Sequence, residues 1–143
     1  MQYKTKCAFE ALKDKEVDYL IHCCNAQGVM GSGFAKTVKE QYPEAYKTYI
    51  EHDLVLGSFT QAGGIINAIA QEYYGKSKGR RYLSYDALTD CFQSIADALP
   101  TGTRVGLPYL VGCDRAGGEW AVVEQVIRTT LAKRCIVTIY RLK

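Results

Sequence analysis

The sequence predicts one α/β domain over residues 1–143, built as a sheet with helices on both faces. Segments of strand character alternate with segments of helical periodicity along the whole chain, which is typical of layered α/β folds. The composition agrees, because 143 residues with 48% hydrophobic and 23% charged residues suit one ordinary domain with one core. Ligands of such sheets bind beyond the carboxyl ends of the strands, so we expect the functional residues in the loops that follow strands.

The first half of the chain supplies three predicted strands and two predicted helices. The compact apolar run over residues 17–24 predicts a buried strand. A helix is expected over residues 33–41, and a proline then opens a second helical piece over residues 43–50. Two further strands are expected at residues 53–59 and 64–70.

The second half of the chain supplies two helices and two strands. Ser84 is a candidate N-cap, and Asp86 is favourable in the first turn that follows it. The apolar face of this helix consists of residues at helical spacing, namely Leu88, Cys91, Phe92, Ile95 and Leu99. Residues 104–108 predict a short strand, residues 118–132 a last helix, and the β-rich residues 135–140 a closing strand.

The charge balance and the cysteines narrow the range of functions. A net charge of +3 fits an anionic ligand but does not by itself indicate nucleic-acid binding. The densest basic stretch, residues 76–81, is expected to be a solvated loop, with contact to phosphates as the alternative. Six cysteines without C-x-x-C spacing predict no metal site, and we expect no cofactor. A polar N-terminus and the lack of a long apolar run lead us to expect a cytoplasmic protein, and a monomer.

The loop over residues 25–35 directly follows a predicted buried strand and opens a helix. This placement directs backbone N–H groups and the positive end of a helix dipole to one point, where a diphosphate is the natural occupant. Gly31 and Gly33 permit close backbone approaches that a Cβ would forbid. The loop is neither a P-loop nor a dinucleotide fingerprint, because the Lys-Ser/Thr pair and the third glycine are missing. A glycine-rich connector that only makes the turn is the alternative.

The loop over residues 108–120 also joins a predicted strand to a predicted helix, with Gly117 and Gly118 before the helix start. Two such loops in one small sheet suggest a ligand with more than one anionic or sugar group. Asp114 and Arg115 place a possible base and a fixed cation in this loop. The alternative for Asp114 is a carboxylate that only caps or turns the backbone.

Five stretches of the chain, in the right order, resemble the macro domain family. Residues 21–35 (IHCCNAQGVMGSGFA) resemble its first ligand loop, and residues 108–120 (PYLVGCDRAGGEW) resemble its second, phosphate-facing loop. Residues 41–46 (QYPEAY), 66–71 (INAIAQ) and 85–88 (YDAL) are similar to further landmarks of the family. The branch that the chain resembles is that of the small ADP-ribose 1″-phosphate phosphatases, with kinship to terminal ADP-ribose glycohydrolases. The resemblance implies a three-layer α/β/α sandwich with a mixed central sheet and an ADP-ribose cleft over the strand ends.

The resemblance also implies roles for individual residues. Asn25 would contact the distal ribose, and Tyr140 would stack on adenine, with packing in the strand as the alternative for Tyr140. The residues that would line the diphosphate and the distal ribose are Gly31, Ser32, Gly33 and Phe34. The residues that would wrap the phosphate side are Val111, Gly112, Cys113, Asp114, Arg115 and Ala116.

The chain departs from the family pattern at three places. Ala8 stands where most macro domains have an Asp that hydrogen-bonds the adenine amino group, and Glu10 is the nearest carboxylate. Gln71 stands where the glycohydrolase branch has a catalytic Lys, which counts against a lysine-dependent mechanism. Asp114 and Arg115 replace a glycine and an apolar residue, so the second loop is unusually charged.

The resulting functional expectation is hydrolysis of ADP-ribose 1″-phosphate to ADP-ribose and phosphate without a metal. Asp114 or His22 would orient or deprotonate the attacking water, and Arg115 would complement the charge of the phosphate. The alternative for His22 is a structural role, because it ends an apolar strand. Two other functions stay open. One is removal of ADP-ribose from protein or nucleic acid, and the other is a reader that binds ADP-ribose without turnover.

Overall fold

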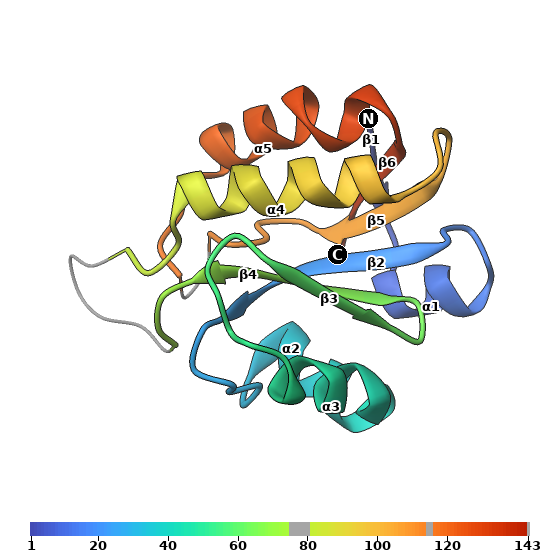
Figure 1. Ribbon diagram of the computed structural model, residues 1–143. Coiled ribbons are helices and arrows are strands. Elements are labelled where there is room, and N and C mark those ends of the chain that lie inside the picture. Colours follow the sequence, from blue (N-terminus) through green and yellow to red (C-terminus); the bar gives the residue numbers. More distant parts are fainter. Residues whose placement is uncertain (75–80, 114–115, 143) are drawn as a thin grey trace.

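The computed structural model describes residues 1–74, 81–113 and 116–142, and its centre is a six-stranded mixed sheet (Figure 1). The strand order is β1-β6-β5-β2-β4-β3, in which β3 runs antiparallel to β4 and every other neighbouring pair is parallel. The strands are β1 (Gln2–Thr5), β2 (Tyr19–Asn25), β3 (Phe59–Ala62), β4 (Ile65–Gln71), β5 (Arg104–Pro108) and β6 (Ile136–Arg141). The predicted mixed sheet is therefore confirmed.

Helices cover both faces of this sheet, as predicted for a three-layer α/β/α sandwich (Figure 1). One face carries α4 (Tyr85–Ala98), α5 (Trp120–Thr129) and the 3-10 turn η1 (Leu131–Lys133). The other face carries α1 (Ala8–Lys13), α2 (Gly33–Gln41) and α3 (Pro43–Glu51). Each face has its own cluster of buried apolar side chains, so the sheet separates two halves of the core.

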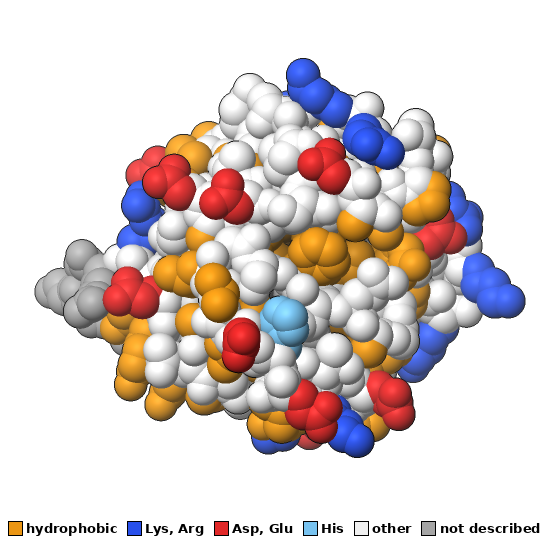
Figure 2. Space-filling model, viewed as in Figure 1, with side chains coloured by type: hydrophobic (Ala, Val, Ile, Leu, Met, Phe, Trp, Pro, Cys, Tyr) orange, Lys and Arg blue, Asp and Glu red, His pale blue; other side chains and the backbone are white. Residues whose placement is uncertain are grey.

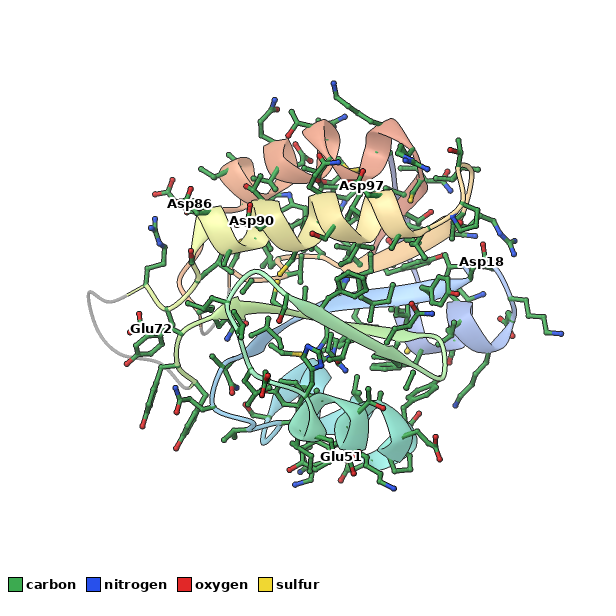
Figure 3. All side chains as sticks on the ribbon, in the orientation of Figure 1. Asp18, Glu51, Glu72, Asp86, Asp90 and Asp97 are labelled. Atoms are coloured by element: carbon green, nitrogen blue, oxygen red, sulfur yellow. The ribbon has the colours of Figure 1, made fainter. Side chains whose placement is uncertain are left out.

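The start signals in the sequence act as expected in α3 and α4. Pro43 occupies the first position of α3, where its missing N–H costs no hydrogen bond. Ser84 caps α4, because its hydroxyl accepts a 3.1 Å bond from the Ala87 amide. The apolar face of α4 is buried, and Asp86, Asp90 and Asp97 lie along its solvent-exposed side (Figure 3).

The strand predicted at residues 53–59 is wrong, because the chain turns there. The Ser58 amide bonds the Val55 carbonyl at 3.1 Å, and Gly57 has φ of 94°, so β3 begins only at Phe59. The apolar residues that suggested a strand lie in this turn, where Val55 is 59% exposed. The first strand, β1, has four exposed side chains, so no hydrophobic pattern predicts it. The last helix begins at Trp120, two residues later than expected.

Charged side chains of both signs are spread over the face seen in Figure 2. This mixed distribution agrees with the small net charge of the sequence, which is +3. Among the described residues, none of the helices combines the length and the apolar character that crossing a membrane requires.

A buried polar network ties α3 to the sheet through Asn67 on β4. The Asn67 side-chain nitrogen donates to the Ala45 carbonyl at 3.1 Å and to the Thr60 hydroxyl at 3.0 Å. The amide oxygen of Asn67 therefore faces His22 Nε2 at 2.6 Å, so Nε2 carries a proton and donates it to this bond. Burial lowers the pKa of His22 to about 4 against the opposing effect of the Asn67 bond, and the imidazole is neutral at pH 7.

We expect Asn67→Ala to lower the free energy of unfolding by about 2–4 kcal/mol, because it leaves buried groups without partners. The His22 N–H and the Ala45 carbonyl would both lose their hydrogen bonds. Urea unfolding at pH 7 measures the change. Gln93→Ala, on the exposed side of α4, is the control and is expected to stay within about 0.5 kcal/mol of the parent. Equal stability of the two variants would contradict the role of the network.

We expect the free energy of unfolding to fall as the pH drops from about 6.5 toward 4. In this range His22 binds a proton in the unfolded chain but stays neutral in the folded chain. The loss should approach about 3 kcal/mol, at about 1.4 kcal/mol per unit of pKa difference. Unfolding titrations of the parent and of His22→Gln at each pH measure it. His52→Gln is the matched control, since His52 is exposed, and it should keep the pH dependence of the parent. A His22→Gln variant with that same dependence would contradict the assignment.

Candidate functional site

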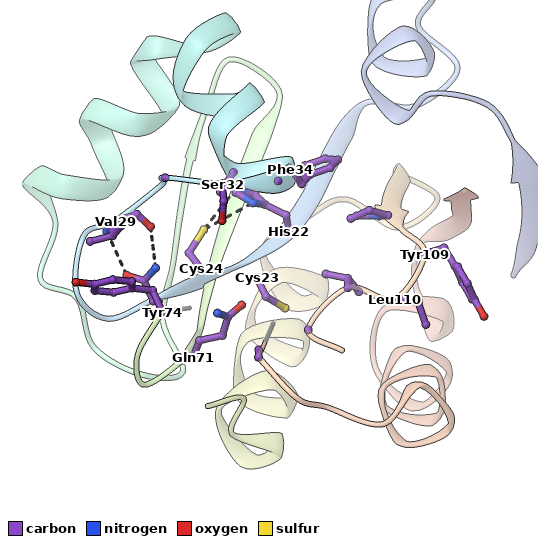
Figure 4. Close-up of a pocket in the computed structure, with 18 residues that line it drawn as sticks. His22, Cys23, Cys24, Val29, Ser32, Phe34, Gln71, Tyr74, Tyr109 and Leu110 are labelled. Carbon is purple, nitrogen blue, oxygen red and sulfur yellow. Dashed lines mark hydrogen bonds between the residues drawn. The ribbon is translucent and has the colours of Figure 1, made fainter. Parts of the chain in front are cut away.

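A cleft of about 580 Å³ lies where the carboxyl ends of β2, β4 and β5 meet (Figure 4). Its volume is in the range of small-molecule sites, roughly 300–1,000 Å³. Two loops form its walls, one after β2 and one after β5, as the sequence predicts. The lining residues of the first loop are Asn25, Val29, Gly31, Ser32, Gly33, Phe34 and Ala35. Those of the second loop are Pro108, Tyr109, Leu110, Val111, Gly112 and Ala116.

Asn25 at the end of β2 organises the first loop. Its side-chain nitrogen donates to the Val29 carbonyl at 2.7 Å, while its amide oxygen accepts bonds from the Gln27 and Val29 amides at 3.0 and 3.2 Å. The Tyr49 hydroxyl of α3 lies 2.9 Å from this oxygen and also close to the Asn25 main-chain carbonyl, so these two acceptors share its one hydrogen. One hydrogen of the Asn25 amide has no protein acceptor in these bonds, and contact of this hydrogen with the distal ribose stays a prediction.

The first loop ends at the start of α2, which opens on the cleft. Gly33 is the first residue of α2 and has φ of 60°, a conformation that favours glycine, with open space where a Cβ would point. Ser32 is the N-cap residue, but its hydroxyl makes no capping bond. The backbone N–H groups of the first helical turn have no partner within the helix, so they are available to a ligand in the cleft.

The second loop is held in place by a close contact between two of its glycines. The Gly118 amide donates to the Gly112 carbonyl at 3.0 Å, and a Cβ at Gly118 would lie 2.6 Å from that same oxygen. It would also lie 2.5 Å from a methyl group of Leu83, a buried residue just before α4. Leu110, which lines the cleft, has φ of 64°, which is unusual for a residue with a side chain.

Two predicted site residues, Cys113 and Tyr140, do not border the main cleft. The Cys113 side chain is half-buried against the core and bonds the Val111 carbonyl at 3.6 Å, and Cys113 does not border the cleft. Tyr140 is only 3% exposed, because its ring lies against Gly106 and its hydroxyl donates to Glu16 at 3.3 Å. Tyr140 nevertheless borders the smaller pocket described below, so its contact with a base stays a prediction, with packing in the strand as the alternative.

His22 lies at the floor of the cleft but is 2% exposed. Its Nε2 is engaged by Asn67, and its ring lies 5.3 Å from that of Phe34. A group so buried, with its pKa lowered to about 4, is a weak and poorly accessible base. The geometry therefore favours the structural alternative for His22 over the catalytic one.

The described residues that line the cleft include no Asp, Glu, Lys or Arg. Asp114 and Arg115, the candidate base and cation, and residues 76–80 of the basic stretch lie outside the described residues. Gln71 borders the cleft from the end of β4. It is the residue that stands where the glycohydrolase branch has a catalytic lysine. Polar recognition in the described part of the cleft therefore comes from amide and hydroxyl side chains and from the backbone.

The thiols in and near the cleft are neutral. Burial raises the pKa of Cys23 and Cys24 well above the ordinary value, and it raises that of Cys113 to about 11. Neutral thiols are poor nucleophiles and poor metal ligands. In the part of the chain that the structure describes, no group of His, Cys, Asp and Glu side chains is arranged to hold a metal ion.

A second pocket, of about 250 Å³, adjoins the cleft because Phe34, Pro108 and Tyr109 border both. Its remaining lining residues are Lys6, Cys7, Ala8, Phe9, Tyr140, Arg141 and Leu142. Sequence reasoning assigned no site role to Tyr74, Tyr109 or Leu110, which line the main cleft. The position of Tyr109 and Leu110 directly after a predicted strand was the available signal, whereas nothing in the sequence around Tyr74 indicates it.

Comparisons with known proteins agree with this geometry. No family model matches the chain. A structure from Bacteroides thetaiotaomicron described as a protein of unknown function is 27% identical, with a TM-score of 0.79 over 99% of this chain and 97% of that one. The macrodomain of Mycobacterium tuberculosis DarG is 25% identical, with a TM-score of 0.71 over 97% and 95%. A macrodomain protein from Streptomyces coelicolor is 28% identical, with a TM-score of 0.62 over 87% of each chain.

Curated relatives match over short stretches. An ADP-ribose 1″-phosphate phosphatase of Ajellomyces capsulatus is 54% identical over 33 residues, which are 23% of this chain and 13% of that protein. One from Meyerozyma guilliermondii is 42% identical over 40 residues, which are 28% of this chain and 23% of that protein. The matches thus span less than a quarter of the length of these relatives. The chain therefore has the fold of these macrodomain structures, and its short matched stretches are similar to ADP-ribose 1″-phosphate phosphatases.

Proposed function

We propose that this macro domain binds ADP-ribose in the main cleft and hydrolyses ADP-ribose 1″-phosphate to ADP-ribose and phosphate. One observation carries the proposal: two glycine-bearing loops, after β2 and β5, face each other across a 580 Å³ cleft at the carboxyl ends of parallel strands. An ADP-ribose ligand has a diphosphate and two sugars, which suit backbone N–H donors along such loops. The short stretches shared with ADP-ribose 1″-phosphate phosphatases support the choice of substrate.

The first loop is suited to the diphosphate. The N-terminus of α2 opens on the cleft at Gly33, and the partial positive charge of the helix end favours an anion there. The hydroxyl of Ser32 makes no capping bond and is a further donor beside it. Positive φ at Gly33 and the absence of a side chain leave room for the ligand to approach the backbone.

The chemical step needs little more than positioning and charge stabilisation. Water attacks the phosphorus, the bond from phosphorus to the 1″ oxygen breaks, and the ribose oxygen gains a proton. In this proposal Asp114 accepts the proton of the water and Arg115 balances the charge of the phosphate. Both belong to the second loop, whose described residues Gly112 and Ala116 border the cleft on either side of them. His22 is assigned a structural role instead, because it is buried and bonded to Asn67.

A second candidate function is binding of ADP-ribose without turnover, as in a reader of ADP-ribosylated macromolecules. The absence of charged side chains among the described residues that line the cleft favours it. Removal of ADP-ribose from protein or nucleic acid is a third outcome that the same assay separates, because its substrate carries a macromolecule on the distal ribose.

We expect the purified protein to release phosphate from ADP-ribose 1″-phosphate, and Asp114→Asn to lower the rate about 100- to 10,000-fold while ADP-ribose binding is kept. Ion-exchange chromatography of the products measures turnover, and calorimetry measures binding. Asp90→Asn, on the exposed side of α4, is the matched control and should keep the parent rate. Unchanged turnover in Asp114→Asn would remove Asp114 from the mechanism. Binding of ADP-ribose without any turnover by the parent would favour the reader.

We expect Gly118→Ala to weaken ADP-ribose binding at least about tenfold, because its Cβ would displace the backbone of the second loop at Gly112. The Leu83 methyl group can move aside, but the Gly112 carbonyl, 2.6 Å away, cannot move without the loop. Gly102→Ala is the matched control, since it strains a turn at φ of 88° with open space around it, in the turn just before β5. Equal losses of affinity in both variants would show a general effect on stability and count against the role of the loop.

A further inference from the structure

The smaller pocket beside the cleft has a volume of about 250 Å³ and is lined in part by aromatic side chains. Phe9 and Phe34 stack with ring centroids 4.4 Å apart, and Tyr109 also lines the pocket. Figure 4 shows Phe34 and Tyr109 toward the end of the main cleft that lies away from Gln71 and Tyr74. Aromatic walls stack on the flat face of any base, so they give affinity without choosing among bases.

Several backbone carbonyls around this pocket already accept a hydrogen bond. Four carbonyls of lining residues accept backbone amides at 2.7–3.1 Å. The bonds run from Ala11 to Cys7, from Val111 to Pro108, from Tyr109 to Tyr140 and from Lys6 to Arg141. The described residues that line the pocket include no Asp or Glu, and the position close to the strand end is occupied by Ala8. An amino group on a base would therefore meet no carboxylate there, and these four carbonyls would each have to accept a second hydrogen bond.

The charged side chains at the pocket are donors only. Lys6 is bound to Asp14 at 2.9 Å and to Glu16 at 2.8 Å, so its ammonium group is committed to carboxylates. The guanidinium of Arg141 lies 5.4 Å from the ring centroid of Tyr109 and 5.8 Å from that of Tyr3. No carboxylate pairs with Arg141 within the described parts of the chain. The guanidinium lies over these two rings, and the N–H groups along the edge of an arginine fork can donate hydrogen bonds to a ligand.

We propose that this pocket takes a 6-oxopurine base, hypoxanthine or guanine, at least as well as adenine, and that Arg141 makes the distinction. A 6-oxopurine presents O6 and N7 as neighbouring acceptors, which an arginine fork bonds in pairs, whereas adenine presents an amino donor beside N7. The inference rests on the proposed function, because it takes the diphosphate and the distal ribose to lie in the adjoining cleft. If the inference holds, the protein accepts ligands whose base is not adenine.

The test compares ADP-ribose with inosine diphosphate ribose, two ligands whose bases differ in the group at C6. Calorimetry with the full chain at one ionic strength gives both dissociation constants. We expect inosine diphosphate ribose to bind as tightly as ADP-ribose or more tightly. In Arg141→Ala its affinity should fall about tenfold while that of ADP-ribose changes less than about twofold. Arg104→Ala is the control. It also removes one positive charge, but at the start of β5, the end of that strand away from the pocket, so it should leave the ratio of the two dissociation constants unchanged.

Three results would overturn the inference. One is tenfold tighter binding of ADP-ribose by the parent protein, and another is an equal loss for both ligands in Arg141→Ala, which would place Arg141 on the shared phosphates or sugars. In both of these cases ADP-ribose still binds and the proposed function stands. The third is that neither ligand binds, which would refute the proposed function together with the inference.

Discussion

Because β2 pairs in parallel with both β4 and β5, three neighbouring strands end at the same edge of the sheet, and the cleft depends on this arrangement. Each strand delivers a loop or a side chain to that edge: Asn25 from β2, Gln71 from β4 and the segment from Pro108 onward from β5. Antiparallel pairing would have sent one of these ends to the opposite side. Among the described strands, β3 pairs antiparallel with β4 and lies at the edge of the sheet, beyond the strands that end at the cleft.

Beneath the cleft, hydrogen bonds between buried polar side chains hold α3 and the sheet together. The bonds from Asn67 to His22, Thr60 and Ala45 fix the position of α3 against the sheet. Tyr49 of that helix then bonds Asn25, so the first loop is positioned through the helix as well as through its own strand. A fully bonded buried network is rigid and admits one arrangement, since each broken bond would leave an unsatisfied group. The floor of the cleft is thus stiff and uncharged at neutral pH.

The main cleft and the smaller pocket beside it offer a ligand different kinds of chemical groups. In the main cleft, the polar groups that the described residues offer include the backbone N–H groups at the start of α2 and the side chains of Asn25, Ser32 and Gln71. At the smaller pocket, aromatic walls are combined with Arg141. In our proposals the first part serves the diphosphate and distal sugar, the second serves the base, and the chemistry belongs to Asp114 and Arg115 in the second loop.

The sequence by itself determined the fold class, the sandwich layers and the two loops, because each depends on local signals. The predicted bounds of α2, α3 and β5 and the predicted apolar face of α4 agree closely with the structure, and glycines after buried strands marked both walls of the cleft. What only the tertiary structure decided is how individual side chains are used. Tyr140 is buried against Gly106, His22 is bonded to Asn67 from a strand 45 residues away, and Arg141 meets Tyr109 across the sheet. Such roles depend on partners distant in the chain, and exposure and hydrogen bonding are properties of the packed neighbourhood that no local pattern encodes.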